Sequence, residues 1–135
     1  MVFYIDIETR DLAMSKTKKV LIIEDNDCLL RLMDHYFGKR YTVFPTRNGL
    51  DAMRYLNDGI LPDIILLDWD MPVMGGEMFL EGLKTSSFFR DIPVIVISGS
   101  KPMEEFENIE ANSCFEKPFD PRKLNAQIQS ALSQA

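Results

Sequence analysis

Cysteine, long apolar runs and basic charge are all scarce in this sequence. Cys28 and Cys114 are its two cysteines, too few for a disulfide framework or for a structural zinc site made by cysteines alone. No apolar run approaches the roughly 18–20 residues that span a bilayer, so no membrane association is expected. The 21 acidic side chains outnumber 15 basic ones, and the net charge of −6 argues against direct DNA binding. These absences favour a protein of a reducing compartment, which we expect to be cytoplasmic.

The composition fits one domain preceded by a short leader. The chain has 135 residues, of which 46% are apolar, enough to bury a core but too few for two full domains. Residues 1–18 combine weak strand-like alternation with a polar, basic run that starts at Met14. We expect a leader that is disordered or lies upstream of a true start at Met14; an extra strand or helix that packs on the domain or on a second copy is the alternative. The domain itself is expected over residues 19–135.

Short apolar strands alternate with helical patterns along the domain. The predicted strands cover residues 20–23, 41–44, 64–67, 94–97 and 114–115. Apolar residues at helical spacing predict helices around 29–37, 50–56, 79–83 and 102–109, and a last helix that Asp120 caps and Pro121 opens. The predicted apolar stripes include Leu32 in the first helix and Leu50 in the second, and Gly38 is the predicted stop of the first. Five strand–helix pairs in strict alternation imply an α/β fold, a doubly wound parallel sheet with helices on both faces.

Polar residues follow the strands at the edge where such sheets carry their functional groups. The residues are Glu24, Asp25, Asp68, Ser98 and Lys117. Carboxylates that share one edge repel each other unless a cation intervenes, and oxygen ligands of this kind suit Mg²⁺. Lys117 and Ser98 complete a cradle for a phosphoryl group, and Asp68, at the end of the most apolar strand, is the natural carboxylate nucleophile.

Most of these residues also have a simpler explanation when taken singly. The acidic residues between positions 24 and 27 are candidates to cap the following helix. Ser98 is a candidate cap or turn residue, and Lys117 a solvated charge. Asp68 is harder to explain in this way, because an acid that follows four apolar residues loses solvation energy unless it has a partner.

The ordered set of residues resembles the receiver domain of bacterial two-component response regulators. The resemblance covers about residues 19–135 and is carried by Glu24-Asp25, Asp68 with Met71-Pro72-Val73-Met74-Gly75-Gly76, Ser98, and Lys117-Pro118-Phe119. It implies a flavodoxin-like fold with strand order 2-1-3-4-5. It also implies a signalling domain that assists its own phosphoryl transfer and dephosphorylation and is not otherwise an enzyme.

The resemblance assigns a role to each residue of the edge. Asp68 would accept a phosphoryl group from a phosphohistidine on a sensor histidine kinase or a phosphotransfer protein. The Mg²⁺ ligands would be Glu24, Asp25, Asp68 and the backbone carbonyl of Asp70. Ser98 and Lys117 would contact the phosphoryl oxygens, and the peptide bond between Lys117 and Pro118 would be cis. Phosphorylation would switch binding to an unknown downstream protein, and a homodimer is possible.

Two other functions compete with a phosphorylation switch. A degenerate receiver would act as a constitutive protein-binding module. The segment Asp68-Trp69-Asp70 also resembles the motif of haloacid-dehalogenase-type phosphatases, although that motif normally follows the first strand. In that alternative Asp68 would be the nucleophile and Asp70 a general acid.

Several positions depart from the receiver pattern. Cys114 occupies the position, three residues before the lysine, where receivers usually carry Tyr or Phe, and the neighbouring Phe115 should point the other way into the core. The stretch that leads to Lys117 is short and has Glu110 where glycine is frequent, so the fourth helix should be short or displaced. Asp70 is an extra acid that either tunes phosphoryl lifetime or metal affinity, or simply faces solvent. His35 is expected to be an exposed surface residue.

Overall fold

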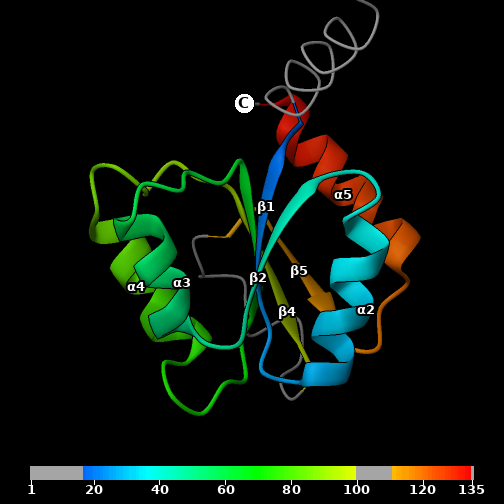
Figure 1. The fold of residues 1–135 in the computed structure, drawn as a ribbon, viewed down its shortest axis with the longest axis horizontal. Helices are drawn as coiled ribbons and strands as arrows, with labels where there is room; N and C mark the ends of the chain where they lie inside the picture. The colour runs from blue at the N-terminus through cyan, green and yellow to red at the C-terminus, as the bar shows by residue number, and fades with distance from the viewer. Residues whose placement is uncertain (1–16, 100–110, 135) are drawn as a thin grey trace, which may run out of the picture.

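The molecule is built around a five-stranded parallel sheet (Figure 1). The computed structural model describes residues 17–99 and 111–134. Its elements are β1 (Lys19–Ile23), α2 (Asp27–Phe37), β2 (Thr42–Thr46), α3 (Gly49–Asn57), β3 (Ile64–Asp68), α4 (Gly76–Thr85), β4 (Val94–Ser98), β5 (Ser113–Glu116) and α5 (Pro121–Ser133). All neighbouring strands pair in parallel in the order β2-β1-β3-β4-β5. The expected doubly wound fold and its strand order are therefore confirmed.

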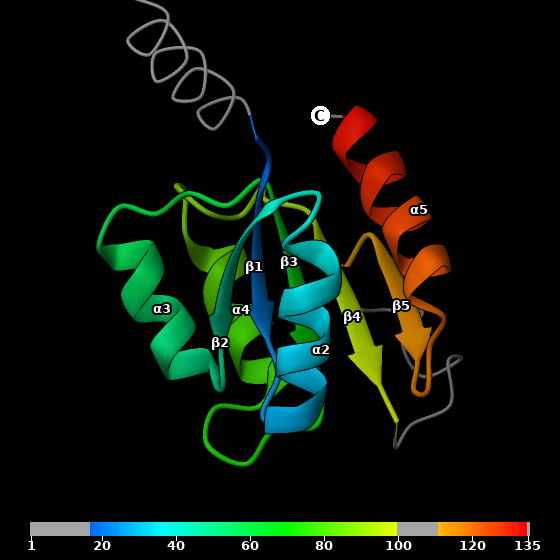
Figure 2. The same ribbon diagram turned by 45° about the vertical axis from the view of Figure 1, so that its right-hand side comes forward.

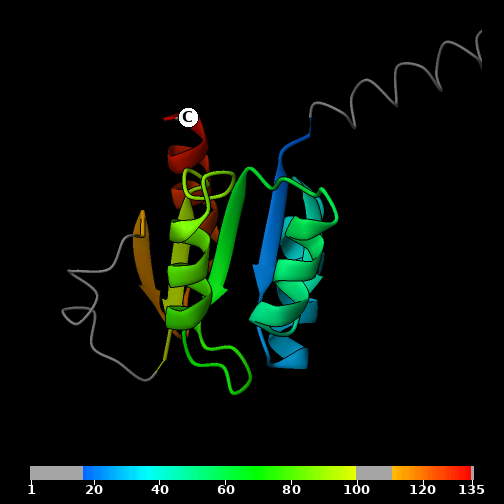
Figure 3. The ribbon, with the colours of Figure 1, turned by 90° about the vertical axis from the view of Figure 1, so that its left-hand side faces the viewer.

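Two apolar cores lie on opposite faces of the sheet. Side chains of successive strand residues point to opposite faces, so Leu21 and Ile65 pack under α3 and α4, whereas Ile22 and Leu66 pack under α2 and α5. Figures 2 and 3 show these helix pairs on either side of the strands. Strands β3 and β4 are buried along their whole length, which explains their continuous apolar sequences. The two cores thus fix the positions of the strands, whose carboxyl ends form one edge of the sheet.

The helices bury faces that partly differ from the predicted stripes. In α2 the buried residues are Leu30, Met33 and Phe37, whereas Leu32, predicted to be on the stripe, is 66% exposed. In α3 the predicted Leu50 is also exposed. Helical spacing was ambiguous because α2 carries two adjacent apolar stripes, and both satisfy a spacing of three to four residues. The exposed stripe of α2 is therefore left at the surface.

The helix ends correct one interpretation and confirm others. The side chain of Asn26 caps α2 by accepting a hydrogen bond from the amide of Leu29 at 2.9 Å. Capping by an acidic residue was therefore the wrong explanation: Asp27 instead pairs with Arg47. The predicted stop of α2 at Gly38 is confirmed, as are the Asp120 cap and Pro121 at the start of α5.

Some predictions fall outside the part of the chain that the structure describes. The leader up to residue 16, the helix predicted around 102–109 and Glu110 belong to this group. Strand β2 runs two residues further than predicted and includes Pro45, which an edge strand tolerates. Within residues 17–99 and 111–134, no helix has the length and apolar character needed to cross a bilayer.

Candidate functional site

The predicted residues meet at the carboxyl edge of the sheet. Glu24 and Asp25 follow β1, Asp68 is the last residue of β3, and Ser98 is the last residue of β4. Ser98 lies opposite Glu116 in the β4–β5 register, so Lys117 extends just beyond it. Strand pairing thereby converts five separate sequence positions into one cluster.

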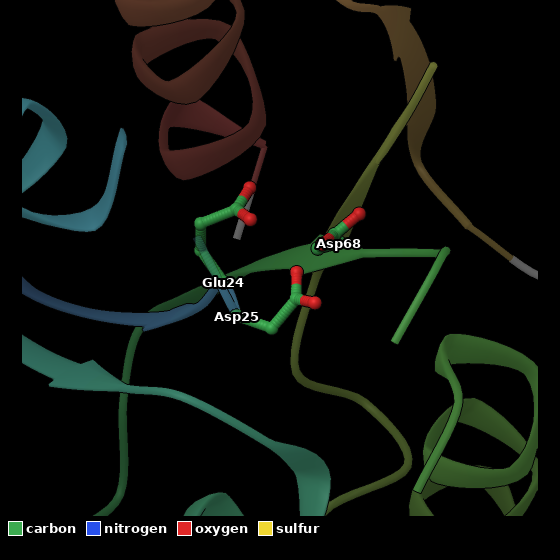
Figure 4. Close-up of side chains that lie close together, drawn as sticks. All are labelled: Glu24, Asp25 and Asp68. Atoms are coloured by element: carbon green, nitrogen blue, oxygen red, sulfur yellow. The ribbon is translucent and has the colours of Figure 1, made fainter. Parts of the chain in front are cut away.

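Three carboxylates form the centre of this cluster. One carboxylate oxygen from each of Glu24, Asp25 and Asp68 lies within 4.8 Å of the other two (Figure 4). Glu24 and Asp68 are each 1% exposed, whereas Asp25 is open to solvent. Burial of two of the three acids means that their charges must be compensated locally.

Lys117 supplies part of that compensation. Its Nζ lies 2.8 Å from Oε1 of Glu24 and 3.3 Å from Oδ1 of Asp68. The other Glu24 oxygen accepts a hydrogen bond from the amide of Asn26 at 3.0 Å, and Oδ1 of Asp68 accepts one from the amide of Asp70 at 3.2 Å. Oδ2 of Asp68 is buried and accepts no hydrogen bond from the described residues. One lysine therefore leaves one buried carboxylate oxygen uncompensated.

The electrostatics of the cluster follow from this geometry. Burial, the neighbouring Asp25 carboxyl and the charge of Glu24 raise the pKa of Asp68 to about 8, against the opposing effects of Lys117 and the Asp70 amide. Burial acts to lower the pKa of Lys117, but its hydrogen bond to Glu24 and the charges of Asp68 and Glu24 outweigh burial and raise it. Lys117 is thus held as a cation, and Asp68 lacks a full countercharge.

The donor set fits a hard divalent cation. Mg²⁺ prefers oxygen ligands and retains several waters, and here three carboxylates converge while Asp25 keeps one side open to solvent. The unpartnered Oδ2 of Asp68 is the atom for which a cation would compensate. The residues present therefore match the ion that the sequence suggested.

Ser98 and Asp70 make a contact that sequence reasoning missed. The buried Ser98 hydroxyl donates a hydrogen bond to Oδ2 of Asp70 at 3.1 Å, and the amide of Gly99 donates to the same oxygen at 3.3 Å. Asp70 is exposed, but its carboxylate does not simply face water. The sequence signal for this contact was Asp70 itself, an acid two residues after Asp68, together with a serine at the end of the neighbouring strand.

Strand β5 places its unusual residues on opposite faces. Cys114 is half-buried against the core under α3 and α4, and Phe115 packs against the core under α2 and α5. The predicted direction of Phe115 is therefore confirmed. The predicted cis bond between Lys117 and Pro118 is also present, and the amide of Lys117 donates to the carbonyl of Ser98 at 2.9 Å.

The loop after Asp68 is anchored by a close backbone contact that the sequence did not reveal. Trp69 is buried, its amide donates to the carbonyl of Ile97, and its carbonyl accepts from the amide of Gly76 at 3.2 Å. A Cβ on Gly76 would lie 2.7 Å from Cα of Trp69. Only glycine fits there, so this contact holds the loop that carries Asp70.

Fold and site together define a class of protein. A doubly wound sheet of order 2-1-3-4-5, with a cation-compatible acidic cluster, a lysine and a serine at its carboxyl edge, is the architecture of a flavodoxin-like signalling domain. The chain matches the family described as the response regulator receiver domain over residues 20–129. It therefore belongs to the receiver domain family of two-component signalling.

Known relatives agree in sequence and in fold. The polar-differentiation response regulator DivK of Brucella anthropi is 31% identical over 122 residues, which cover 87% of this chain and 98% of that protein. The receiver domain of a signal transduction histidine kinase from Syntrophus aciditrophicus is 30% identical, with a TM-score of 0.78 and coverage of 87% and 92%. The receiver domain of a putative Luxo repressor protein from Vibrio parahaemolyticus is 24% identical, with a TM-score of 0.79 and the same coverage.

Family membership decides against one of the two competing functions. Receiver domains are signalling domains that act with histidine kinases or phosphotransfer proteins and with downstream effectors. The alternative of a haloacid-dehalogenase-type phosphatase was therefore wrong. Asp68 also ends β3 and not the first strand, and the Asp70 carboxylate is engaged by Ser98 and Gly99.

Proposed function

We propose that this domain is a Mg²⁺-dependent phosphorylation switch in which Asp68 accepts the phosphoryl group. The observation that carries the proposal is the buried Asp68 carboxylate, which has one unpartnered oxygen and lies beside Lys117 and two further acids. Such a group is poorly solvated, unlike a structural aspartate whose two carboxylate oxygens are both paired.

The chemistry assigns one task to each residue. An Oδ atom of Asp68 attacks the phosphorus of a phosphohistidine, the P–N bond breaks, and its electron pair stays on the imidazole nitrogen. Lys117 neutralises negative charge on the phosphoryl oxygens, and Ser98 donates a hydrogen bond to one of them. Glu24, Asp25, Asp68 and the backbone carbonyl of Asp70 would hold Mg²⁺. When bound, the ion offsets the charge of the carboxylates and of the incoming phosphoryl group.

The raised pKa of Asp68 explains why a cation is needed. A carboxylate nucleophile must be ionised, and without added positive charge Asp68 retains its proton up to about pH 8. A phosphoryl group adds about −1.5 to −2 charges to the edge, which Lys117 alone would not offset. Phosphorylation is therefore expected to depend on a divalent cation as well as on Lys117.

An apolar groove beside Lys117 is a candidate docking surface for the phosphohistidine donor. This groove of about 590 Å³ lies between α2 and the segment from Lys117 to Pro121 and is lined mainly by apolar residues, among them Leu32, Tyr36 and Phe119. Lys117 lines this groove and also pairs with Asp68, so a partner in the groove lies next to the acceptor. We propose that the kinase or phosphotransfer protein binds here.

The remaining proposals concern the limits and location of the domain. We propose that residues 1–18 form a leader and residues 19–135 the receiver domain. A cytoplasmic location is supported by two free cysteines, of which Cys28 is exposed. The downstream protein is expected to recognise the phosphorylated surface, and dimerisation is a second possible output of the switch.

A labelling experiment tests the phosphoacceptor. With Mg²⁺ and acetyl phosphate, the wild type should gain one phosphoryl group, detected by intact mass, while Asp68→Asn gains none because the amide is not a nucleophile. Asp91→Asn is the matched control, since Asp91 is an exposed acid before β4, at the opposite edge of the sheet. Unchanged labelling of Asp68→Asn contradicts the assignment. A wild type that is never labelled supports the constitutive binding module.

A further inference from the structure

Asp70 joins the ends of β3 and β4 through its hydrogen bonds. Its amide donates to Oδ1 of Asp68, and its Oδ2 accepts from both the hydroxyl of Ser98 and the amide of Gly99. One residue therefore contacts the proposed acceptor with its backbone and the proposed phosphoryl-binding residue with its side chain. The proposed roles of Asp68, Ser98 and the Asp70 carbonyl do not require this second contact.

The Ser98 hydroxyl cannot serve two acceptors at once. A hydroxyl carries a single O–H donor, and here that donor is directed at the Asp70 carboxylate at 3.1 Å. A phosphoryl group on Asp68 would need the same donor. Phosphorylation therefore requires an exchange of hydrogen-bond partners, from one anionic acceptor within the chain to another on the modified aspartate.

The bond that must be exchanged runs to a carboxylate, and its length of 3.1 Å is at the long end for a hydroxyl donor. What favours it is its surroundings. Ser98 is 1% exposed, so water does not compete for its hydroxyl, and Gly99 adds a second bond to the same oxygen. By contrast, the exposed position of Asp70 means that solvent and salt screen its longer-range repulsion of other anions.

We propose that Asp70 is a positioning residue that holds Ser98 and Gly99 in the unphosphorylated arrangement and competes with the phosphoryl group for the Ser98 hydroxyl. The inference rests on the proposed function, because the competition requires a phosphoryl group on Asp68. Asp70 thereby lowers the fraction of phosphorylated domains that reach the switched state. It acts as an internal anion that the phosphoryl group must displace.

The first experiment measures the contact without any phosphodonor. In ¹⁵N-labelled protein free of divalent cations, Asp70→Ala should move the Gly99 amide proton upfield and accelerate its exchange with solvent, because the hydrogen bond is lost. Asp70→Asn retains an oxygen acceptor and should show the smaller change. Asp91→Ala removes an exposed acid at the opposite edge and should leave Gly99 unchanged.

The second experiment measures the competition with beryllofluoride, a phosphoryl mimic, in the presence of Mg²⁺. Removing one opposing hydrogen bond should tighten beryllofluoride binding to Asp70→Ala by about fivefold or more, and to Asp70→Asn by less. In a Ser98→Ala background the same Asp70→Ala change should gain only about twofold or less, because the contested donor is already gone. Asp91→Ala serves again as the control for net charge.

The outcomes separate this inference from the proposed function. An equal gain for Asp70→Ala and Asp70→Asn that persists in the Ser98→Ala background shows repulsion alone and overturns the inference. An unmoved Gly99 amide also overturns it. A wild type that binds beryllofluoride and is labelled, with Asp70 variants unchanged, overturns this inference only. A wild type that does neither overturns the proposed function and this inference together.

Discussion

At the scale of single residues, burial decides the chemistry of Asp68. The side chain ends a strand buried along its whole length, and its pKa is raised to about 8 by burial and by two neighbouring acids. The same residue in an unfolded chain would ionise near pH 4. Folding therefore favours the protonated form, and the ionised form carries an energetic cost that a cation offsets.

This cost predicts a pH dependence of stability. Without divalent cations, the stability associated with protonated Asp68 is complete below about pH 4 and is lost as the pH rises towards about 8. Asp68→Asn removes this dependence and should exceed the wild type by at least about 1 kcal/mol at pH 8, since one pKa unit corresponds to about 1.4 kcal/mol. Urea denaturation in EDTA at several pH values measures the difference.

Added Mg²⁺ provides the control for this prediction. The ion should stabilise the wild type at pH 8, and it should stabilise Asp68→Asn much less, because that variant lacks one of the three carboxylates. A difference between the two proteins that stays constant from pH 4 to 8 would show that Asp68 is not the group that titrates.

Residue-level sequence reasoning was most informative where a side chain had no good structural alternative. Asp68 was predicted to need a partner because it is an acid that follows an apolar strand, and it is indeed buried and paired with Lys117. The engagement of Asp70 was not predictable, because it depends on how the ends of β3 and β4 are placed in space. Asn26 was likewise overlooked as the cap of α2, because the neighbouring acids are equally good caps by residue type.

At the scale of elements, the loop between β3 and α4 is held by one tight contact. A Cβ on Gly76 would lie 2.7 Å from Cα of Trp69 and 2.9 Å from the carbonyl oxygen of Asp68, and backbone atoms cannot easily give way. The loop carries Asp70, whose amide contacts Asp68. The packing of a glycine thus supports the geometry of the site.

Gly76→Ala should therefore destabilise the domain. Forcing a methyl group into packed backbone costs about 1–3 kcal/mol, and we expect a loss of that size in the free energy of unfolding. Urea denaturation measures it. Gly75→Ala is the matched control, because its Cβ would approach only the carbonyl oxygen of Met71, at 3.7 Å. Equal stability losses in both variants would contradict the role of the Trp69 contact.

The type of each element was predictable from the sequence, but the buried face of each helix was less so. The alternation of apolar runs and helical stripes was enough to place all five strands. Helix α2 carries two apolar stripes, and only its packing against β1, β2 and α5 decides that Met33 is buried and Leu32 exposed. The exposed stripe then became part of the groove beside Lys117.

At the scale of the whole molecule, that groove lies beside Lys117, which pairs with the buried Asp68, the proposed acceptor. Asp68 is 1% exposed, so a protein donor must settle close to the edge of the sheet to deliver a phosphoryl group. Leu32 and Phe119 offer apolar area there, and Lys117 connects that area to the acidic cluster. In the proposed function, docking and phosphoryl transfer would therefore take place side by side on one side of the fold.

Leu32→Glu should separate docking from chemistry. A charge in the groove should slow labelling by a phosphohistidine protein that labels the wild type by about tenfold or more, as expected when an interface anchor is lost. Labelling by acetyl phosphate should be unchanged, because this small donor does not use the groove. Phe88→Glu is the control, since Phe88 is 84% exposed and lies outside the groove. Equal losses with both donors, or with Phe88→Glu, would contradict the docking surface.

The sequence by itself determined the class of fold and the residue types that meet at the carboxyl edge of the sheet. Apolar strands in strict alternation with helices admit few topologies, and oxygen ligands with a lysine and a serine suit few reactions. Tertiary structure alone decided what depends on distances between segments: that Lys117 reaches both Glu24 and Asp68, that one oxygen of Asp68 stays unpartnered, and that Asp70 holds Ser98. Residue types can be read along a chain, but the partners of buried charges arise only when strands distant in sequence are paired.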